Sequence, residues 1–181
     1  ATTSDETLGV RSGPGKSRPH PAVIEVEYTS RDSAADPPPS GSLFGVTDRI
    51  DTVDRDSLVA AALDARDRAY VPYSGCRRGA AVATSDGAVV TGAIVENVSL
   101  GLAMCAERVA LFTTVTSGAR PVALAVASPR TDGTLTFPCG ACVQVALELG
   151  GSDLVVIAAS VDGDRHECTV GELLPHGPKK G

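Results

Sequence analysis

The spacing of hydrophobic residues predicts helices in three parts of the chain. Between residues 54 and 69 the apolar positions recur every three or four residues, and Asp54 or Asp56 is placed to cap the helix. A second helix is predicted over residues 105–117 and a third over residues 139–149. The apolar face of the first helix consists of Leu58, Ala62, Ala65 and Ala69. The face expected for the second consists of Ala106, Val109, Ala110 and Thr113.

Shorter segments rich in Val, Thr and Ala alternate with these helices and predict a β-sheet. The first two of them flank Ser85-Asp86-Gly87, a sequence typical of hairpin turns. The predicted strands are residues 79–84, 88–95, 122–127, 154–159 and 165–169. Because strands alternate with helices, we predict an α/β fold in which helices pack in layers against a mixed sheet.

Residues 1–52 differ in composition from the rest of the chain. They contain six of the twelve prolines among Ser, Asp, Gly and Thr, a composition that buries too little apolar surface to offset the entropy of ordering. We therefore expect a mostly disordered N-terminal extension, in which residues 23–28 are the one plausible strand. One folded domain is assigned to residues 53–175 and a short tail to residues 176–181.

Charge and hydropathy limit the partners of the chain. The net charge of −6 argues against nucleic acid as the main partner, because domains that bind a phosphate backbone usually carry a basic stripe. No apolar run reaches the roughly 20 residues that span a bilayer, so no membrane partner is expected. The N-terminal residues show no apolar export signal, and a cytoplasmic location is expected by default. In that reducing compartment, clustered cysteines are more often metal ligands or catalytic groups than disulfides.

Three of the five cysteines have the spacing of a metal site. They occur in Cys105-Ala106-Glu107 and in Pro138-Cys139-Gly140-Ala141-Cys142, each at the predicted start of a helix. The positive end of a helix dipole favours thiolate, which is the form that binds metal. Three protein ligands leave one position of a tetrahedral zinc ion open, as catalysis requires. A Cys-x-x-Cys pair on its own is more often structural zinc or a redox pair. The segment Cys105-Ala106-Glu107 upstream of it is what favours a catalytic zinc site.

The two residues after Cys105-Ala106 complete the predicted chemistry. Glu107 lies too close in sequence to Cys105 to share its metal comfortably, and it is better placed to take a proton from the attacking water and pass it on. Three thiolates leave a zinc site negative, so we expect Arg108 to donate hydrogen bonds to the ligand sulfurs and compensate the charge. The plain alternatives are a solvated carboxylate for Glu107 and a surface ion pair for Arg108.

The combination Cys-x-Glu followed by Pro-Cys-x-x-Cys is the signature of zinc deaminases. From about residue 54 to residue 175 the chain resembles the small, homotetrameric, zinc-dependent cytidine deaminases. The further matching segments are Ala69-Tyr70-Val71-Pro72-Tyr73-Ser74, Gly79-Ala80-Ala81, Val95-Glu96-Asn97, Gln144 and Thr169-Val170-Gly171-Glu172-Leu173-Leu174-Pro175. The resemblance implies a three-layer fold with helices on both faces of a sheet of about five strands, and a tetramer. It also implies hydrolysis of cytidine or 2′-deoxycytidine to the uridine product and ammonia.

The same resemblance implies substrate contacts, and at these the chain departs from the family. Glu96 is expected to hold a sugar hydroxyl, and the backbone of Ala106 and of Phe137 to orient the base. The family's Asn two residues before that Glu is Ile94 here, and a Phe near the base is Cys76. The other departures are Arg78 in place of an apolar residue, Leu100 in place of a Tyr, and a C-terminal tail without the family's Phe.

These departures leave the substrate open. One alternative is a deaminase of a modified cytosine nucleoside, such as an antibiotic resembling blasticidin S. Another is a non-catalytic member of the family that zinc stabilises. Glu96 has its own plain alternative, a solvent-exposed group on an edge strand. Editing of a polynucleotide is disfavoured by the negative net charge.

Overall fold

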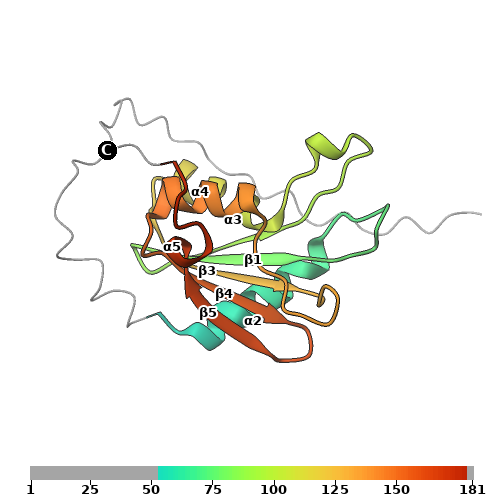
Figure 1. Ribbon diagram of the computed structural model, residues 1–181, viewed down its shortest axis with the longest axis horizontal. Helices are drawn as coiled ribbons and strands as arrows, with labels where there is room; N and C mark the ends of the chain where they lie inside the picture. Colours follow the sequence, from blue (N-terminus) through green and yellow to red (C-terminus); the bar gives the residue numbers. More distant parts are fainter. Residues whose placement is uncertain (1–52, 179–181) are drawn as a thin grey trace, which may run out of the picture. The chain divides into compact units, whose positions relative to one another are not determined.

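Five strands form one mixed sheet in the order β2-β1-β3-β4-β5 (Figure 1). The computed structural model describes residues 53–178, and the predictions for residues 1–52 and 179–181 lie outside this part. The strands are β1 (Gly79–Thr84), β2 (Val89–Ala93), β3 (Pro121–Ser128), β4 (Val155–Ser160) and β5 (Arg165–Thr169). Only the β3–β4 pair is parallel, and the other three neighbouring pairs are antiparallel.

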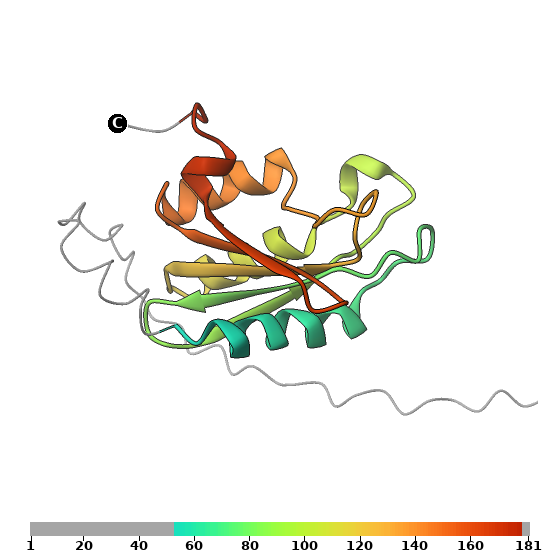
Figure 2. The ribbon, with the colours of Figure 1, turned by 60° about the horizontal axis from the view of Figure 1, so that its bottom comes forward.

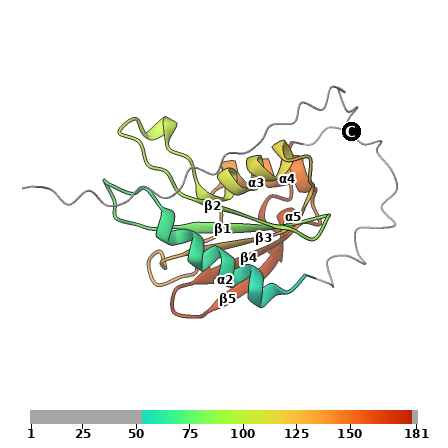
Figure 3. The ribbon, with the colours of Figure 1, turned by 180° about the vertical axis from the view of Figure 1, so that it is seen from behind.

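Helices cover both faces of the sheet, which gives three layers (Figures 1 and 2). The helices are α2 (Arg55–Ala65), α3 (Ala106–Thr116), α4 (Gly140–Gly150) and the short α5 (Val170–Leu173). Helix α2 buries Leu58, Ala62 and Ala65 on one face of the sheet, and it crosses in front of the strands in Figure 3. Helices α3 and α4 pack on the other face. No helix within residues 53–178 combines the length and apolar character that crossing a bilayer requires.

Small residues in the sheet let the helices lie close to it. On the α2 face the strands present Ala81, Ala83, Ala123, Ala125, Ala127 and Ile157. On the face of α3 and α4 they present Ala80, Val82, Leu124, Val126 and Val156. These two sets alternate along each strand, as the two-residue period of a pleated strand requires. The core therefore has two layers, and few aromatic side chains are needed to fill it.

Strand direction brings the starts of α3 and α4 to the same end of the sheet. Both β2 and β3 run antiparallel to β1, so Ala93 at the end of β2 and Ala127 next to the end of β3 both pair with Gly79 at the beginning of β1. The chain leaves both strands at this end before it enters α3 and α4. Segments far apart in sequence are thereby brought together.

The elements predicted within residues 53–178 are present, with small shifts at their ends. The first helix ends at Ala65 and continues as a 3-10 turn to Arg68, so Ala69, which was expected on its apolar face, is extended and lies outside it. Asp54 caps the helix by accepting from the backbone N–H groups of Asp56 and Ser57. The face expected for the second helix was wrong at one position, because Thr113 is exposed and Thr114 is buried. The buried residues of α3 are Ala106, Glu107, Ala110, Leu111 and Thr114. At the C-terminus, Gln144 donates to the carbonyl of Pro178, a residue of the predicted tail.

The position of α3 depends on a glycine in β2. A Cβ atom at Gly92 would lie 2.4 Å from the backbone oxygen of Ala106 and 2.6 Å from the backbone nitrogen of Ala110. Both contacts are with backbone, so no side chain can move aside to make room. Glycine at this position lets the first turn of α3 lie directly on the sheet.

We predict that Gly92→Ala destabilises the protein by about 1–3 kcal/mol, because the added methyl group overpacks the contact between β2 and α3. Urea unfolding measures the change. Gly101→Ala is the matched control, since a Cβ atom there meets nothing within 4 Å and its effect should stay within about 0.5 kcal/mol. Equal stability of the two variants would contradict the packing described here.

Candidate functional site

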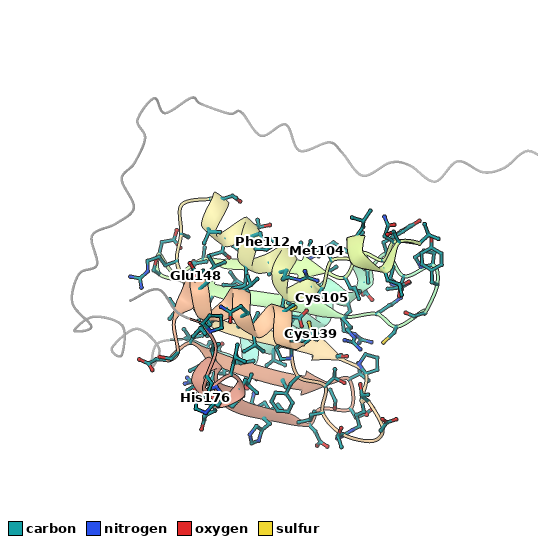
Figure 4. All side chains as sticks on the ribbon, turned by 45° about the horizontal axis from the view of Figure 1, so that its top comes forward. Met104, Cys105, Phe112, Cys139, Glu148 and His176 are labelled. Atoms are coloured by element: carbon teal, nitrogen blue, oxygen red, sulfur yellow. The ribbon has the colours of Figure 1, made fainter. Side chains whose placement is uncertain are left out.

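Two of the three predicted ligand cysteines are the N-caps of helices. Cys105 caps α3 and Cys139 caps α4, and neither side chain bonds the backbone of its helix. Cysteine is not among the side chains that normally cap helices, which are Ser, Thr, Asp and Asn. The two sulfurs are therefore free for another partner, and Figure 4 shows Cys105 and Cys139 side by side at the starts of their helices.

The third cysteine completes a group of three sulfurs. Cys142 is buried in the first turn of α4, and its Sγ lies 3.5 Å from the Sγ of Cys139. The sulfurs of Cys105, Cys139 and Cys142 all lie within 4.8 Å of one another, and all three thiols are free. Ligand sulfurs about 2.3 Å from a tetrahedral zinc ion lie about 3.8 Å apart, so the observed spacing fits that ion. Cys76 and Cys168 do not belong to this group.

The three thiols do not share their charge equally. The neighbouring thiol of Cys142 and the guanidinium of Arg108 lower the pKa of Cys105 to about 5. The pKa of Cys142 is raised, because its proton is held in the hydrogen bond to Cys105 and the group is buried. Arg108 Nη2 lies 3.7 Å from Cys105 Sγ, the contact expected of a group that compensates thiolate charge. A metal cation bound between the sulfurs would replace the proton that Cys105 and Cys142 share.

Glu107 is a buried carboxyl group in the first turn of α3. It is 3% exposed, and its Oε2 has no hydrogen-bond partner within residues 53–178. Burial raises the pKa of Glu107, and the nearby Cys105 acts in the same direction, while Arg78 and Arg108 oppose them. Leaving a buried polar atom unpaired is costly, so such an atom is expected to face a ligand or a reacting group.

Glu96 is connected to the metal site through the backbone. Val95 pairs with Met104, the residue before Cys105, and this pairing closes a loop over residues 96–103. The carboxylate of Glu96 accepts hydrogen bonds from the backbone N–H groups of Tyr73 and Ser74, at 3.0 and 3.2 Å. It also accepts from the Ser74 hydroxyl. The hydrogen bond from the Ser74 hydroxyl is the largest of the effects that lower the pKa of Glu96, so the group is held as a carboxylate.

Ala106, a predicted substrate contact, is the first residue of α3, so its backbone N–H has no intrahelical partner and can serve a ligand. Two other features of the site were not predicted from the sequence. The Ser74 contact with Glu96 was missed, although Ser74 lies in a matching segment. Arg78 was noted only as a departure, and its charge acts on Glu107.

Known proteins are similar to this chain in sequence. A family model for the "Cytidine and deoxycytidylate deaminase zinc-binding region" matches residues 40–127. A cytidine deaminase of Halalkalibacterium halodurans is 46% identical over 123 residues, which are 68% of this chain and 92% of that protein. The match to a zinc-binding region agrees with the three-sulfur group and confirms the predicted cofactor.

Solved structures agree with the fold. The crystal structure of cytidine deaminase from Burkholderia pseudomallei aligns with a TM-score of 0.65 and 44% identity, over 70% of this chain and 100% of that one. The structure of cytidine deaminase from Mycobacterium tuberculosis aligns with a TM-score of 0.61 and 41% identity, over 71% and 99%. The predicted three-layer α/β fold is thereby confirmed.

We predict that purified protein carries about one zinc ion per chain, bound by three cysteines. Cys142→Ser should lose most of that zinc and melt at a lower temperature, because the metal joins the starts of two helices. Cys168→Ser is the control and should keep its zinc, since that thiol lies outside the group. Metal analysis and thermal melting measure both effects. Full zinc content in a variant that lacks Cys105, Cys139 and Cys142 would contradict the assignment.

Proposed function

The chain belongs to the cytidine deaminase family, and from this premise we propose that it hydrolyses the C4 amino group of a cytosine nucleoside. Cytidine and 2′-deoxycytidine are the substrates that the relatives indicate, and the products are the uracil nucleoside and ammonia. One observation carries the proposal: a buried, unpaired carboxyl oxygen of Glu107 lies two residues after Cys105 in a group of three converging sulfurs.

Cys105, Cys139 and Cys142 are the residues that would hold the metal. When bound there, zinc supplies a Lewis acid that makes water a strong nucleophile near neutral pH. Three thiolates on one divalent ion leave an excess of negative charge. The guanidinium of Arg108, in contact with Cys105, offsets part of that excess and keeps the site electrophilic.

Glu107 is proposed to move the protons. Its carboxylate takes a proton from the attacking water as oxygen adds to C4, and it delivers this proton to the ring nitrogen. The bond between C4 and the exocyclic amino nitrogen then breaks, and Glu107 transfers the second water proton to the departing amine, which leaves as ammonia. Burial suits this role, because a raised pKa brings the carboxyl closer to the pH at which the enzyme works.

The remaining proposals concern the surroundings of the site. The free N–H of Ala106 and the backbone of Phe137 orient the base, and Glu96 holds a sugar hydroxyl.

A homotetramer is proposed because Val98, Leu100 and Leu102 in the 96–103 loop are all exposed, Leu100 by 87%, and such apolar clusters mark interfaces. A cytoplasmic location is proposed because all cysteines within residues 53–178 are free thiols.

Glu107→Gln should keep its zinc and its fold while kcat falls by about 10²–10⁴-fold, because the amide cannot accept and return the proton. An ultraviolet assay of cytidine turnover measures the loss. Glu148→Gln is the matched control, because Glu148 is exposed on α4 and no role is proposed for it. Near-normal turnover by Glu107→Gln would rule out the proposed proton transfer. Inactivity of the zinc-loaded wild type toward every cytosine nucleoside would instead favour a non-catalytic protein.

Ile94→Asn should lower KM for cytidine by roughly a factor of 2 to 13, since a hydrogen bond to a buried partner contributes about 0.5–1.5 kcal/mol. Glu96→Ala should raise KM by more than this, because it removes the proposed sugar contact and releases the backbone of Tyr73 and Ser74. Steady-state kinetics with cytidine test both. If Ile94→Asn gives no gain, the sugar does not lie beside residue 94, and a modified nucleoside becomes the better assignment.

A further inference from the structure

The segment between α2 and β1, residues 66–78, is rich in arginine. Its arginines are Arg66, Arg68, Arg77 and Arg78. Within residues 53–178 none of these four forms an ion pair with a carboxylate. Elsewhere Arg55, Arg130 and Arg165 each pair with an acidic residue. Three of the four are accounted for by other contacts: Arg66 and Arg77 donate to backbone carbonyls and Arg68 to the Thr91 hydroxyl.

Arg78 is the fourth of these arginines, and its position directly before β1 places it at the end of the sheet that carries the metal site. It immediately precedes β1, at the end of the sheet where α3 and α4 begin. Its carbonyl accepts from the backbone N–H of Ile94 at 3.1 Å, which extends the pairing of β1 with β2 by one step. Ala80 and Val82 belong to the core beneath α3 and α4, so the two-residue period places Arg78 on that same face.

The surroundings of Arg78 lack a partner for its guanidinium. The side chain is partly buried, and within residues 53–178 no hydrogen bond or ion pair to the guanidinium is found. A guanidinium stays charged at any physiological pH and offers five N–H donors. Its position before β1, on the face that α3 and α4 cover, places it at the end of the sheet where Cys105 and Glu107 begin α3.

We infer that Arg78 binds an anionic group of the substrate, so that the preferred substrate is a cytosine nucleoside bearing a phosphate or a carboxylate on its sugar. This rests on the proposed function. Phosphate and carboxylate oxygens both match the donor fork of Arg. A small anion fits better than a polynucleotide, because the chain as a whole carries a net charge of −6.

Turnover of three substrates by the zinc-loaded protein tests the inference: cytidine, cytidine 5′-monophosphate and cytidine 5′-carboxylate. The wild type should show a kcat/KM at least about tenfold higher for one of the anionic substrates than for cytidine. Which of the two anions is preferred identifies the source of the charge. Arg78→Leu should reduce this ratio by about tenfold or more, and Arg78→Lys should retain part of it. Arg120→Leu removes the same charge at the far end of β1 and should leave the ratio unchanged.

Binding without turnover provides a second measurement. Calorimetry should show that uridine 5′-monophosphate, or uridine 5′-carboxylate if that anion is the one preferred, binds the wild type at least about tenfold more tightly than uridine. This advantage should disappear in Arg78→Leu. Equal affinities for the neutral and both anionic ligands would overturn the inference.

The kinetic outcomes separate this inference from the proposed function. Good turnover of cytidine with no preference for either anion would overturn the inference and leave the function intact. An equal loss for neutral and anionic substrates in Arg78→Leu would also overturn it, since Arg78 would then act only through Glu107. Preference for a single-stranded oligonucleotide over all three compounds would do the same. No turnover of any compound would overturn the function, and the binding measurement would still decide the role of Arg78.

Discussion

The convergence of three cysteine sulfurs at the starts of α3 and α4 is the constraint on which the rest of the site depends. It follows from strand direction, because β2 and β3 both run antiparallel to β1 and release the chain at the same end of the sheet. Gly92 then lets α3 lie directly on β2. Cys105 and Cys139 are the N-cap residues of their helices, but neither side chain bonds the helix backbone, so both sulfurs are free to bind a metal. The fold thus builds the metal site from elements more than thirty residues apart in sequence.

The same convergence gathers negative charge at one point, and neighbouring residues compensate for it. Several thiols at one point favour a single shared charge until a cation replaces the proton, as the opposite pKa shifts of Cys105 and Cys142 show. Arg108 stabilises the charge on Cys105 from the same helix. Burial of Glu107 in the first turn of α3 keeps a carboxyl group beside this charge, with one oxygen unpaired within residues 53–178. Each group is costly to bury alone, and together they form a site suited to proton transfer.

The sequence predicted the elements of the fold and the metal-binding residues well, because both depend on local patterns. Strand β5 was predicted at its observed bounds, and the two cysteine segments were placed at helix starts. The buried side of α3 was misplaced at Thr113, since tertiary packing decides which side of a weakly amphipathic helix is covered.

Contacts between distant segments were harder to predict. The hydrogen bonds of Ser74 to Glu96 span 22 residues, and no periodic signal marks them. Arg78 was noted only as a departure from the family's sequence. Its proposed role depends on the face of the strand on which it lies and on the lack of a partner for its guanidinium within residues 53–178.

The central claim is that three cysteines and one open position form a catalytic zinc site. X-ray absorption at the zinc edge of the purified protein tests it most directly. We predict three sulfur ligands at about 2.3 Å and one oxygen ligand at about 2.0 Å. Four sulfur ligands would indicate a closed, structural site and would contradict the account, as would a zinc ion without sulfur ligands.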